Sequence, residues 1–113
     1  MNFSEYEVRA LAFAEYPDLG QNAIYPALKL NGEAGEVAGK IGKLWRNEKQ
    51  SRPSDYSSDD KSAIAKELGD VLWYINALAH ELGYHLDEIA DTNLQKLTNR
   101  RERGVIKSQG DNR

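Results

Sequence analysis

The sequence predicts an all-α protein, because three features of it favour helices over strands. Apolar residues recur at spacings of three and four through most of the chain, as in a helix with one buried face. Strand alternation is almost absent, and capping or helix-ending residues stand where the periodicity starts and stops. The 113 residues, 40% of them hydrophobic, suffice for one modest core. We therefore expect a four-helix bundle formed by one domain over 1–104, followed by a polar, frayed tail over 105–113.

Two helices are expected in the first half of the chain. The first covers about 4–16, because Asn2 or Ser4 can cap its start and Pro17 closes its end. The second runs from residue 22 or 26 to about Trp45, where its apolar periodicity stops. The expected inner faces are Val8, Leu11 and Ala12 in the first helix and Leu30, Val37, Ile41 and Leu44 in the second.

Two further helices are expected after a polar loop. Residues 47–61 are rich in serine and aspartate, which is typical of a loop or a lid. Asp59 or Asp60 caps a third helix that runs to about Leu82, and a fourth covers about 87–103; a glycine follows each of them. The expected inner residues are Ile64, Leu68, Val71, Leu72, Ile75, Leu78 and Leu82 in the third helix and Leu86, Ile89, Ala90, Leu94 and Leu97 in the fourth.

Two acidic pairs occupy equivalent positions in the second and third helices. Glu33 and Glu36 are followed 34 residues later by Glu67 and Asp70, and the neighbouring glycine, valine, isoleucine and leucine repeat in the same register. At about 100° per residue, each pair borders the apolar stripe of its helix. If the stripes pack together, four carboxylates converge, which is unfavourable without a cation or a shared proton. Oxygen ligands without cysteine favour a hard ion, Mg²⁺ first and Mn²⁺ next.

Other interpretations of these helices remain open from the residues alone. Either acidic pair taken singly is more often a solvated surface, and Glu36 with Lys40 is also an ordinary i,i+4 pair. A ferritin-like di-iron bundle requires Glu-x-x-His pairs, which neither motif contains. A glycine stripe on the second helix would let another helix or a flat ligand approach closely. That stripe consists of Gly32, Gly35, Gly39 and Gly42.

Three strings carry a resemblance to a known family. LKLNGEAGEVAGKIGKL, KELGDVLWYINAL and NLQKLTNRRERG together resemble the MazG-like all-α nucleoside triphosphate pyrophosphohydrolases, marked by Glu-x-x-Glu on one helix and Glu-x-x-Asp on the next. The resemblance covers about 22–104. It implies Mg²⁺-dependent hydrolysis of a nucleoside or deoxynucleoside triphosphate between the α and β phosphates, giving the monophosphate and pyrophosphate in nucleotide-pool house-cleaning. It also implies a homodimer or tetramer, whose helical bundle contains more than one chain.

The resemblance also implies roles for the acidic residues. Position by position, Glu33, Glu36, Glu67 and Asp70 match the metal ligands of the family. One of these carboxylates could also take the proton from the attacking water, and Glu33 or Glu36 is favoured as that catalytic base. The residues do not decide between the two.

Cations and aromatic side chains are the expected substrate contacts. The fourth helix offers Asn93, Lys96 and Arg100 on one face, and Lys96 matches the lysine of the family's C-terminal Lys-Leu pattern. Two lysines follow the first acidic pair along the same side, and one tyrosine lies a turn beyond the second pair, where it could stack on the base. A solvated surface is the alternative for each lysine. These three residues are Lys40, Lys43 and Tyr74.

Charge and composition limit the classes of partner that we expect. A net charge of −3 with both signs interspersed gives no reason to expect nucleic acid or a membrane surface as a partner. The start of the chain has no signal-peptide pattern, so we expect a cytoplasmic protein. The alternative to an enzyme is a non-catalytic nucleotide-binding or regulatory helical module. Aromatic residues near the N-terminus are expected to contact a second copy, namely Phe3, Tyr6, Phe13 and Tyr16.

Overall fold

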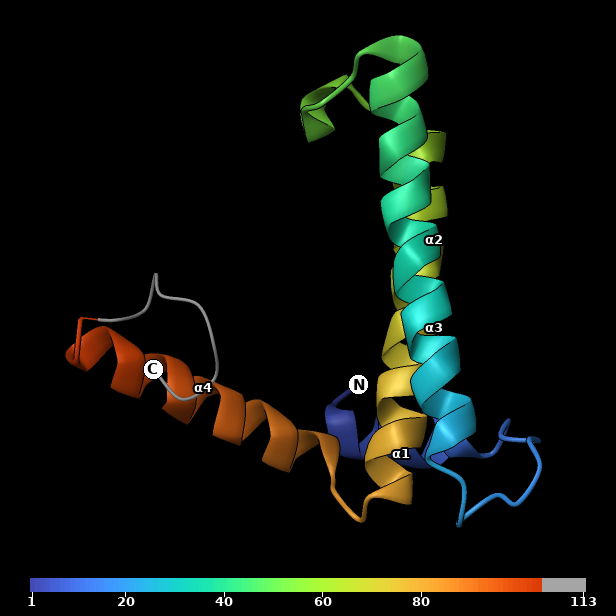
Figure 1. The fold of residues 1–113 in the computed structure, drawn as a ribbon, viewed down its shortest axis with the longest axis vertical. Helices are drawn as coiled ribbons and strands as arrows, with labels where there is room; N and C mark the ends of the chain where they lie inside the picture. The colour runs from blue at the N-terminus through green and yellow to red at the C-terminus, as the bar shows by residue number, and fades with distance from the viewer. Residues whose placement is uncertain (105–113) are drawn as a thin grey trace.

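The computed structural model describes residues 1–104, and four α-helices are its main elements (Figure 1). No strand occurs within that span, so the predicted all-α class is confirmed. The tail predicted over 105–113 lies outside the described residues. The elements are α1 (Phe3–Leu11), α2 (Ile24–Glu48), the short 3-10 turn η1 (Pro53–Asp55), α3 (Ser58–Glu81) and α4 (Leu86–Glu102).

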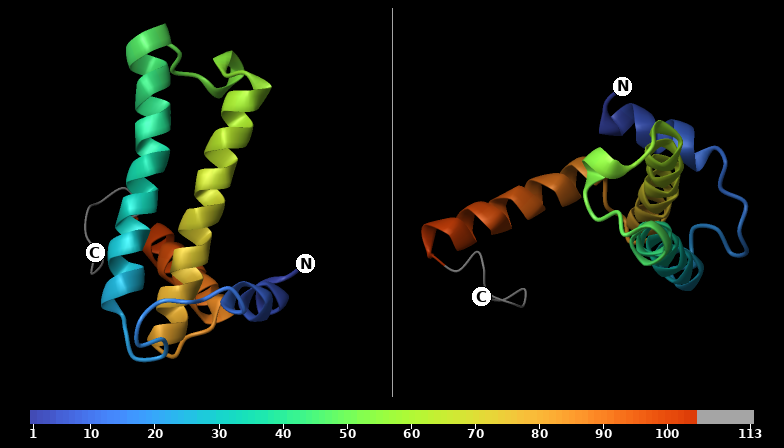
Figure 2. Two further views of the ribbon diagram at one scale, coloured as in Figure 1. Left: turned by 90° about the vertical axis from the view of Figure 1, so that its right-hand side faces the viewer. Right: turned by 90° about the horizontal axis from the view of Figure 1, so that it is seen from above.

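The helices form an open arrangement within one chain. α2 and α3 run antiparallel as a long hairpin, α1 lies across its base, and α4 projects away from it (Figures 1 and 2). The principal extents of 43 × 42 × 28 Å reflect these two diverging arms. A single chain therefore does not close a bundle around all four helices, and closure by a second chain stays a prediction. Over the described residues, no helix is long and apolar enough to cross a membrane.

The buried core is small and sits at the base of the hairpin. Its apolar residues come from α1, the connection after it, the start of α2, the end of α3 and the start of α4. Several residues predicted to face inward are exposed instead, because the thin hairpin, the short α1 and the diverging α4 leave much of each helix without a neighbour. The buried residues include Ala10, Tyr16, Pro26, Ala77, Ala79 and Leu86. The wrong predictions concern Val8, Ala12, Ile41, Leu68, Leu82, Ile89 and Leu94.

The boundaries of α1 and α3 show which of the candidate residues cap these helices and where α1 ends. Asn2 caps α1 as predicted, since its side chain accepts a hydrogen bond from the Glu5 N–H at 2.9 Å. The helix ends at Leu11 rather than near Tyr16, whose ring turns back to pack on α2. The cap of α3 is Ser57, not one of the two aspartates proposed. Those aspartates lie inside the first turn, where negative charge favours the helix dipole.

Glu7 on α1 holds the start of α4. One carboxylate oxygen lies 3.0 Å from Nδ1 of His85, and the other accepts a hydrogen bond from the Leu86 N–H. His85 is the residue before α4, and its own N–H is bonded by Glu88. The Leu86 N–H is the main cause of a lowered Glu7 pKa, while the Glu7 carboxylate raises the pKa of His85. This junction ties the first turn of α4 to α1 at the base of the hairpin.

The turn between α3 and α4 depends on a glycine. Gly83 has φ +80°, in the left-handed region that residues with a Cβ adopt at a cost. We expect Gly83→Ala to lower the free energy of unfolding by about 1 kcal/mol, measured by urea denaturation. Gly83→Asn should lose clearly less, because asparagine tolerates this conformation best among the other residues. Equal losses in the two variants would mean that the backbone angle is not the cause.

Candidate metal centre

Three carboxylates from the two long helices converge in the middle of the hairpin. Glu33 comes from α2, and Glu67 and Asp70 come from α3. One oxygen of each lies within 4.8 Å of the others, close enough to bind a single ion. Antiparallel pairing of α2 with α3 produces this approach, because the acidic pairs border the stripes through which the helices pack. The predicted convergence of the two motifs is thus present in the structure.

Glu36 borders this group without joining it. Its side chain is exposed, and it is not among the three residues whose oxygens lie within 4.8 Å of one another. Its carboxyl is nevertheless close enough to raise the pKa of both Glu33 and Glu67. The structure therefore brings together three of the four predicted carboxylates and leaves the fourth at their edge.

The electrostatics of the cluster suit a cation. Partial burial raises the pKa of Glu33, and the charges of Glu36 and Asp70 raise it further. Burial also raises the pKa of Glu67, followed by the adjoining Glu36, while Lys40 at 3.8 Å lowers it. The Oε2 atom of Glu67 is buried without a hydrogen-bond partner in the structure. A buried carboxylate oxygen left unpaired is unfavourable, and a divalent ion would satisfy it.

The raised pKa values predict how the metal-free protein responds to pH. A carboxyl whose pKa is raised on folding binds its proton more tightly in the native state, so its contribution to stability falls as pH rises above the ordinary value of 4.5. Between about pH 5 and about pH 7, in chelator, the free energy of unfolding should decline less steeply in Glu67→Gln than in the wild type. The raised pKa of His85 makes stability fall as pH rises in the wild type and in the variant alike. The difference between the two curves therefore reports on the carboxylate cluster alone. Parallel curves would contradict this interpretation.

An aromatic cavity adjoins the carboxylates. It has a volume of about 310 Å³ and is lined by Phe13, Glu33, Asp70, Trp73 and Tyr74. The predicted substrate residue Tyr74 thus lies beside the cluster, and burial followed by a hydrogen bond with Tyr25 raises its pKa to about 12. Phe13 was expected only as a contact for a second copy. No local pattern could have placed it here, because it follows the end of α1.

The lysines of α2 divide between the cluster and solvent. Lys40 pairs with Glu67 across the hairpin rather than with Glu36 along the helix. Lys43 is exposed, and no contact of it with the cluster is present among the described residues. Lys29 was not among the predicted contacts, yet its Nζ lies 5.9 Å from the centroid of the Tyr74 ring and its charge lowers the pKa of Glu33. Its position one turn before Glu33 on the same helix was the available signal.

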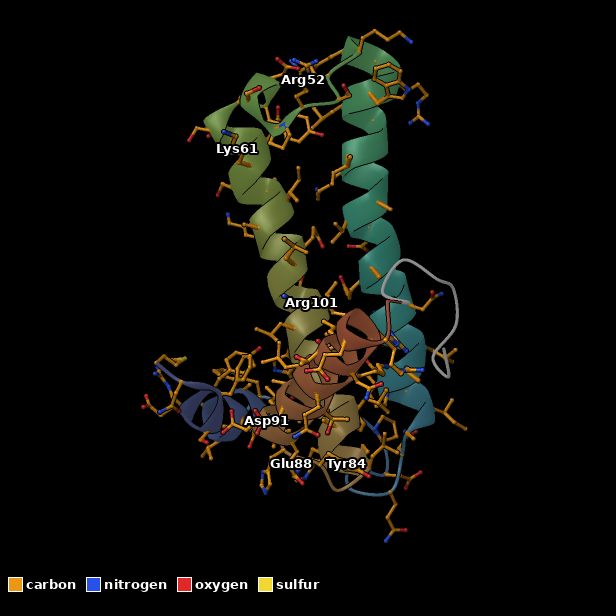
Figure 3. The ribbon with its side chains drawn as sticks, turned by 90° about the vertical axis from the view of Figure 1, so that its left-hand side faces the viewer. Arg52, Lys61, Tyr84, Glu88, Asp91 and Arg101 are labelled. Carbon is orange, nitrogen blue, oxygen red and sulfur yellow. The ribbon has the colours of Figure 1, made fainter. Side chains whose placement is uncertain are left out.

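The structure does not bring the predicted α4 residues to the carboxylates of the same chain. Asn93 and Lys96 line a separate groove of about 430 Å³. Tyr84 and Glu88 line the same groove, and both lie near the base of the hairpin (Figure 3). Arg100 is 4% exposed. Since α4 leaves the hairpin at its base, these side chains could approach a carboxylate cluster only in another chain, or after a large movement of α4.

Comparisons with known proteins agree with this arrangement. A family model described as the MazG nucleotide pyrophosphohydrolase domain matches residues 22–105, which include both acidic pairs. The chain is also 39% identical to the Gene 37 protein of Mycobacterium phage L5, over 118 aligned positions that span all of both proteins. No solved structure matches the chain. The chain therefore belongs to the MazG nucleotide pyrophosphohydrolase family.

Proposed function

We propose that this protein is a divalent-metal-dependent pyrophosphohydrolase that cleaves nucleoside or deoxynucleoside triphosphates between the α and β phosphates. The observation that carries the proposal is the convergence of Glu33, Glu67 and Asp70 beside an aromatic cavity, in a member of this family. Such an enzyme would clear unwanted nucleotides from the cytoplasmic pool.

The metal ligands in this proposal are Glu33, Glu67 and Asp70, with Glu36 completing the set from the edge of the cluster. All donor atoms are carboxylate oxygens, which suits Mg²⁺ and, as a substitute, Mn²⁺. The unpaired Oε2 of Glu67 supports a cation at this place. When bound, such an ion screens the charge of a triphosphate and lowers the pKa of a coordinated water.

The chemical step requires a base on the protein. The attacking water forms a bond to the α phosphorus, and the bond from that phosphorus to the α–β bridging oxygen breaks, so that pyrophosphate leaves. Glu33 or Glu36 accepts the proton that the water loses.

The remaining parts of the substrate have separate contacts. Tyr74, with Phe13 and Trp73 around the cavity, contacts the nucleobase of the substrate. Lys40 and Lys43 contact the phosphates from α2. Asn93, Lys96 and Arg100 contribute from α4 of another chain, since α4 diverges from its own hairpin. This part of the proposal requires a homodimer or tetramer, which the many exposed apolar residues of the single chain favour.

Product analysis tests the proposed reaction. Purified protein is incubated with each common nucleoside and deoxynucleoside triphosphate, with Mg²⁺ or with chelator, and the products are separated. We expect monophosphate and pyrophosphate only when the metal is present. Diphosphate with free phosphate would replace the proposed bond cleavage with a phosphohydrolase reaction. Unchanged triphosphate after hours would favour the non-catalytic nucleotide-binding module.

A further inference from the structure

A carboxylate at the end of α3 organises the connection between α1 and α2. Glu81 accepts hydrogen bonds from the hydroxyl of Tyr16 at 3.0 Å, from the Gly20 N–H at 2.8 Å and from the Asn22 N–H at 3.0 Å. All three donors belong to the segment that joins the two helices. One side chain of α3 therefore holds the middle and the second half of a connection that has no regular structure of its own.

These bonds offset an unfavourable backbone. Asp18 has a φ of 55°, in the left-handed region that residues with a Cβ adopt at a cost, whereas Gly20 adopts its φ of 93° freely. Burial raises the pKa of Glu81, but the N–H groups of Asn22 and Gly20 and the hydroxyl of Tyr16 lower it overall. The carboxylate is therefore the form that the structure favours, and it is the form able to accept three hydrogen bonds.

The connection is joined to the aromatic cavity by stacked rings. Tyr16 is 7% exposed and stacks on Tyr25, with ring centroids 5.1 Å apart and planes inclined by 18°. Tyr25 in turn packs against Tyr74 at 6.4 Å. Tyr74 lines the cavity together with Phe13, which belongs to the same connection. The position of the cavity wall thus depends on contacts that begin at the end of α3.

We propose that Glu81 is a positioning residue for the nucleobase: by holding Tyr16 it positions Tyr74 through the ring contacts of Tyr16 and Tyr25, and it steadies the connection to which Phe13 belongs. This inference rests on the proposed function, because it assumes that a nucleotide occupies the cavity. Glu81 touches neither the substrate nor the carboxylate cluster. A substitution of Glu81 should therefore weaken binding of the nucleobase and leave metal binding and the chemical step unchanged.

The variant Glu81→Gln tests this role. Glutamine has the same shape but only one acceptor oxygen, and its amide group cannot accept from the remaining N–H or hydroxyl donors. With the deoxynucleoside triphosphate that the wild type cleaves best, we expect KM to rise roughly tenfold while kcat stays within about twofold. The affinity of the free protein for Mn²⁺, measured by electron paramagnetic resonance, should not change. Simple partial unfolding would instead lower kcat and leave KM unaltered.

Two further variants make the result specific. Glu15→Gln makes the same substitution in the same connection, but Glu15 is exposed and forms no hydrogen bond among the described residues, so its kinetics should match the wild type. Tyr16→Phe keeps the ring stack and removes only the hydroxyl bond to Glu81, so its KM should rise by a smaller factor. It also serves as the test if Glu81→Gln does not fold.

The possible outcomes separate the two proposals. If the wild type cleaves nucleotides and the KM values of Glu81→Gln and Tyr16→Phe equal that of the wild type, the positioning role is wrong and the proposed function stands. If the wild type cleaves no nucleotide, the proposed function is wrong and the positioning role fails with it. A raised KM in Glu81→Gln but not in Glu15→Gln, with unchanged Mn²⁺ affinity, supports both.

Discussion

Asp70→Asn is expected to reduce Mg²⁺-dependent cleavage of nucleoside triphosphates by about 1,000-fold or more. Asp70 supplies one of the three oxygens that lie within 4.8 Å of one another, and an amide is a much weaker ligand for a hard divalent ion. The measurement is the steady-state rate of pyrophosphate release at saturating Mg²⁺. Far-ultraviolet circular dichroism should show an unchanged helical content, because Asp70 is exposed and no hydrogen bond of the described fold depends on it.

Asp91→Asn is the matched control for this variant. Asp91 is an exposed aspartate on α4, outside the hairpin that carries the cluster (Figure 3). Its substitution removes the same charge and should leave the rate near that of the wild type. In chelator, Asp70→Asn should melt at the same temperature as the wild type or higher, because it removes one of several crowded like charges. Near-normal activity of Asp70→Asn would exclude Asp70 as a metal ligand.

Two inactive variants are expected to recover activity when they are mixed. Asp70→Asn damages the carboxylate cluster, and Lys96→Ala removes a proposed phosphate contact on the diverging helix α4. If Lys96 acts on the cluster of a second chain, a mixed dimer of the two variants contains one intact site. Random exchange of subunits in an equal mixture should then restore about a quarter of the wild-type activity. The measurement is pyrophosphate release before and after the variants are allowed to exchange.

The control for this experiment mixes two variants that damage the same part of the site. Asp70→Asn with Glu67→Gln leaves no cluster with all its carboxylates, so that mixture should stay inactive. If the Asp70→Asn and Lys96→Ala mixture also stays inactive although mass spectrometry detects mixed oligomers, Lys96 does not act between chains. If Lys96→Ala alone keeps full activity, Lys96 is not a substrate contact.

The sequence by itself was sufficient to predict the four helices and to identify the two acidic pairs. Periodicity, caps and glycines are local signals, so four helices were predicted with ends mostly within a few residues of those observed. The convergence of Glu33 with Glu67 and Asp70 also followed from local spacing, because residues that border two packed stripes must meet where the stripes pack. The roles of these residues as metal ligands stay a proposal that the variants above test.

Only the tertiary structure decided which side chains from distant segments meet. Tyr16 was expected to contact a partner, yet it is buried, because its hydroxyl donates a hydrogen bond to the carboxylate of Glu81 and Tyr25 covers its ring. Phe13 lies beside the carboxylates because α1 ends early at Leu11. Such contacts join residues of different segments, up to 65 positions apart for Tyr16 and Glu81, and no periodicity within one helix encodes them.

The direction of α4 is the clearest example of a feature that depends on tertiary contacts. Its helical pattern predicted where it begins and ends, but not that Glu7 would hold its first turn or that the helix would lead away from the hairpin. That direction leaves apolar residues such as Leu94 exposed and separates Lys96 from the carboxylates of its own chain. Helix formation depends on neighbours three and four residues away, whereas helix placement depends on hydrogen bonds and packing between segments that the chain brings together only on folding.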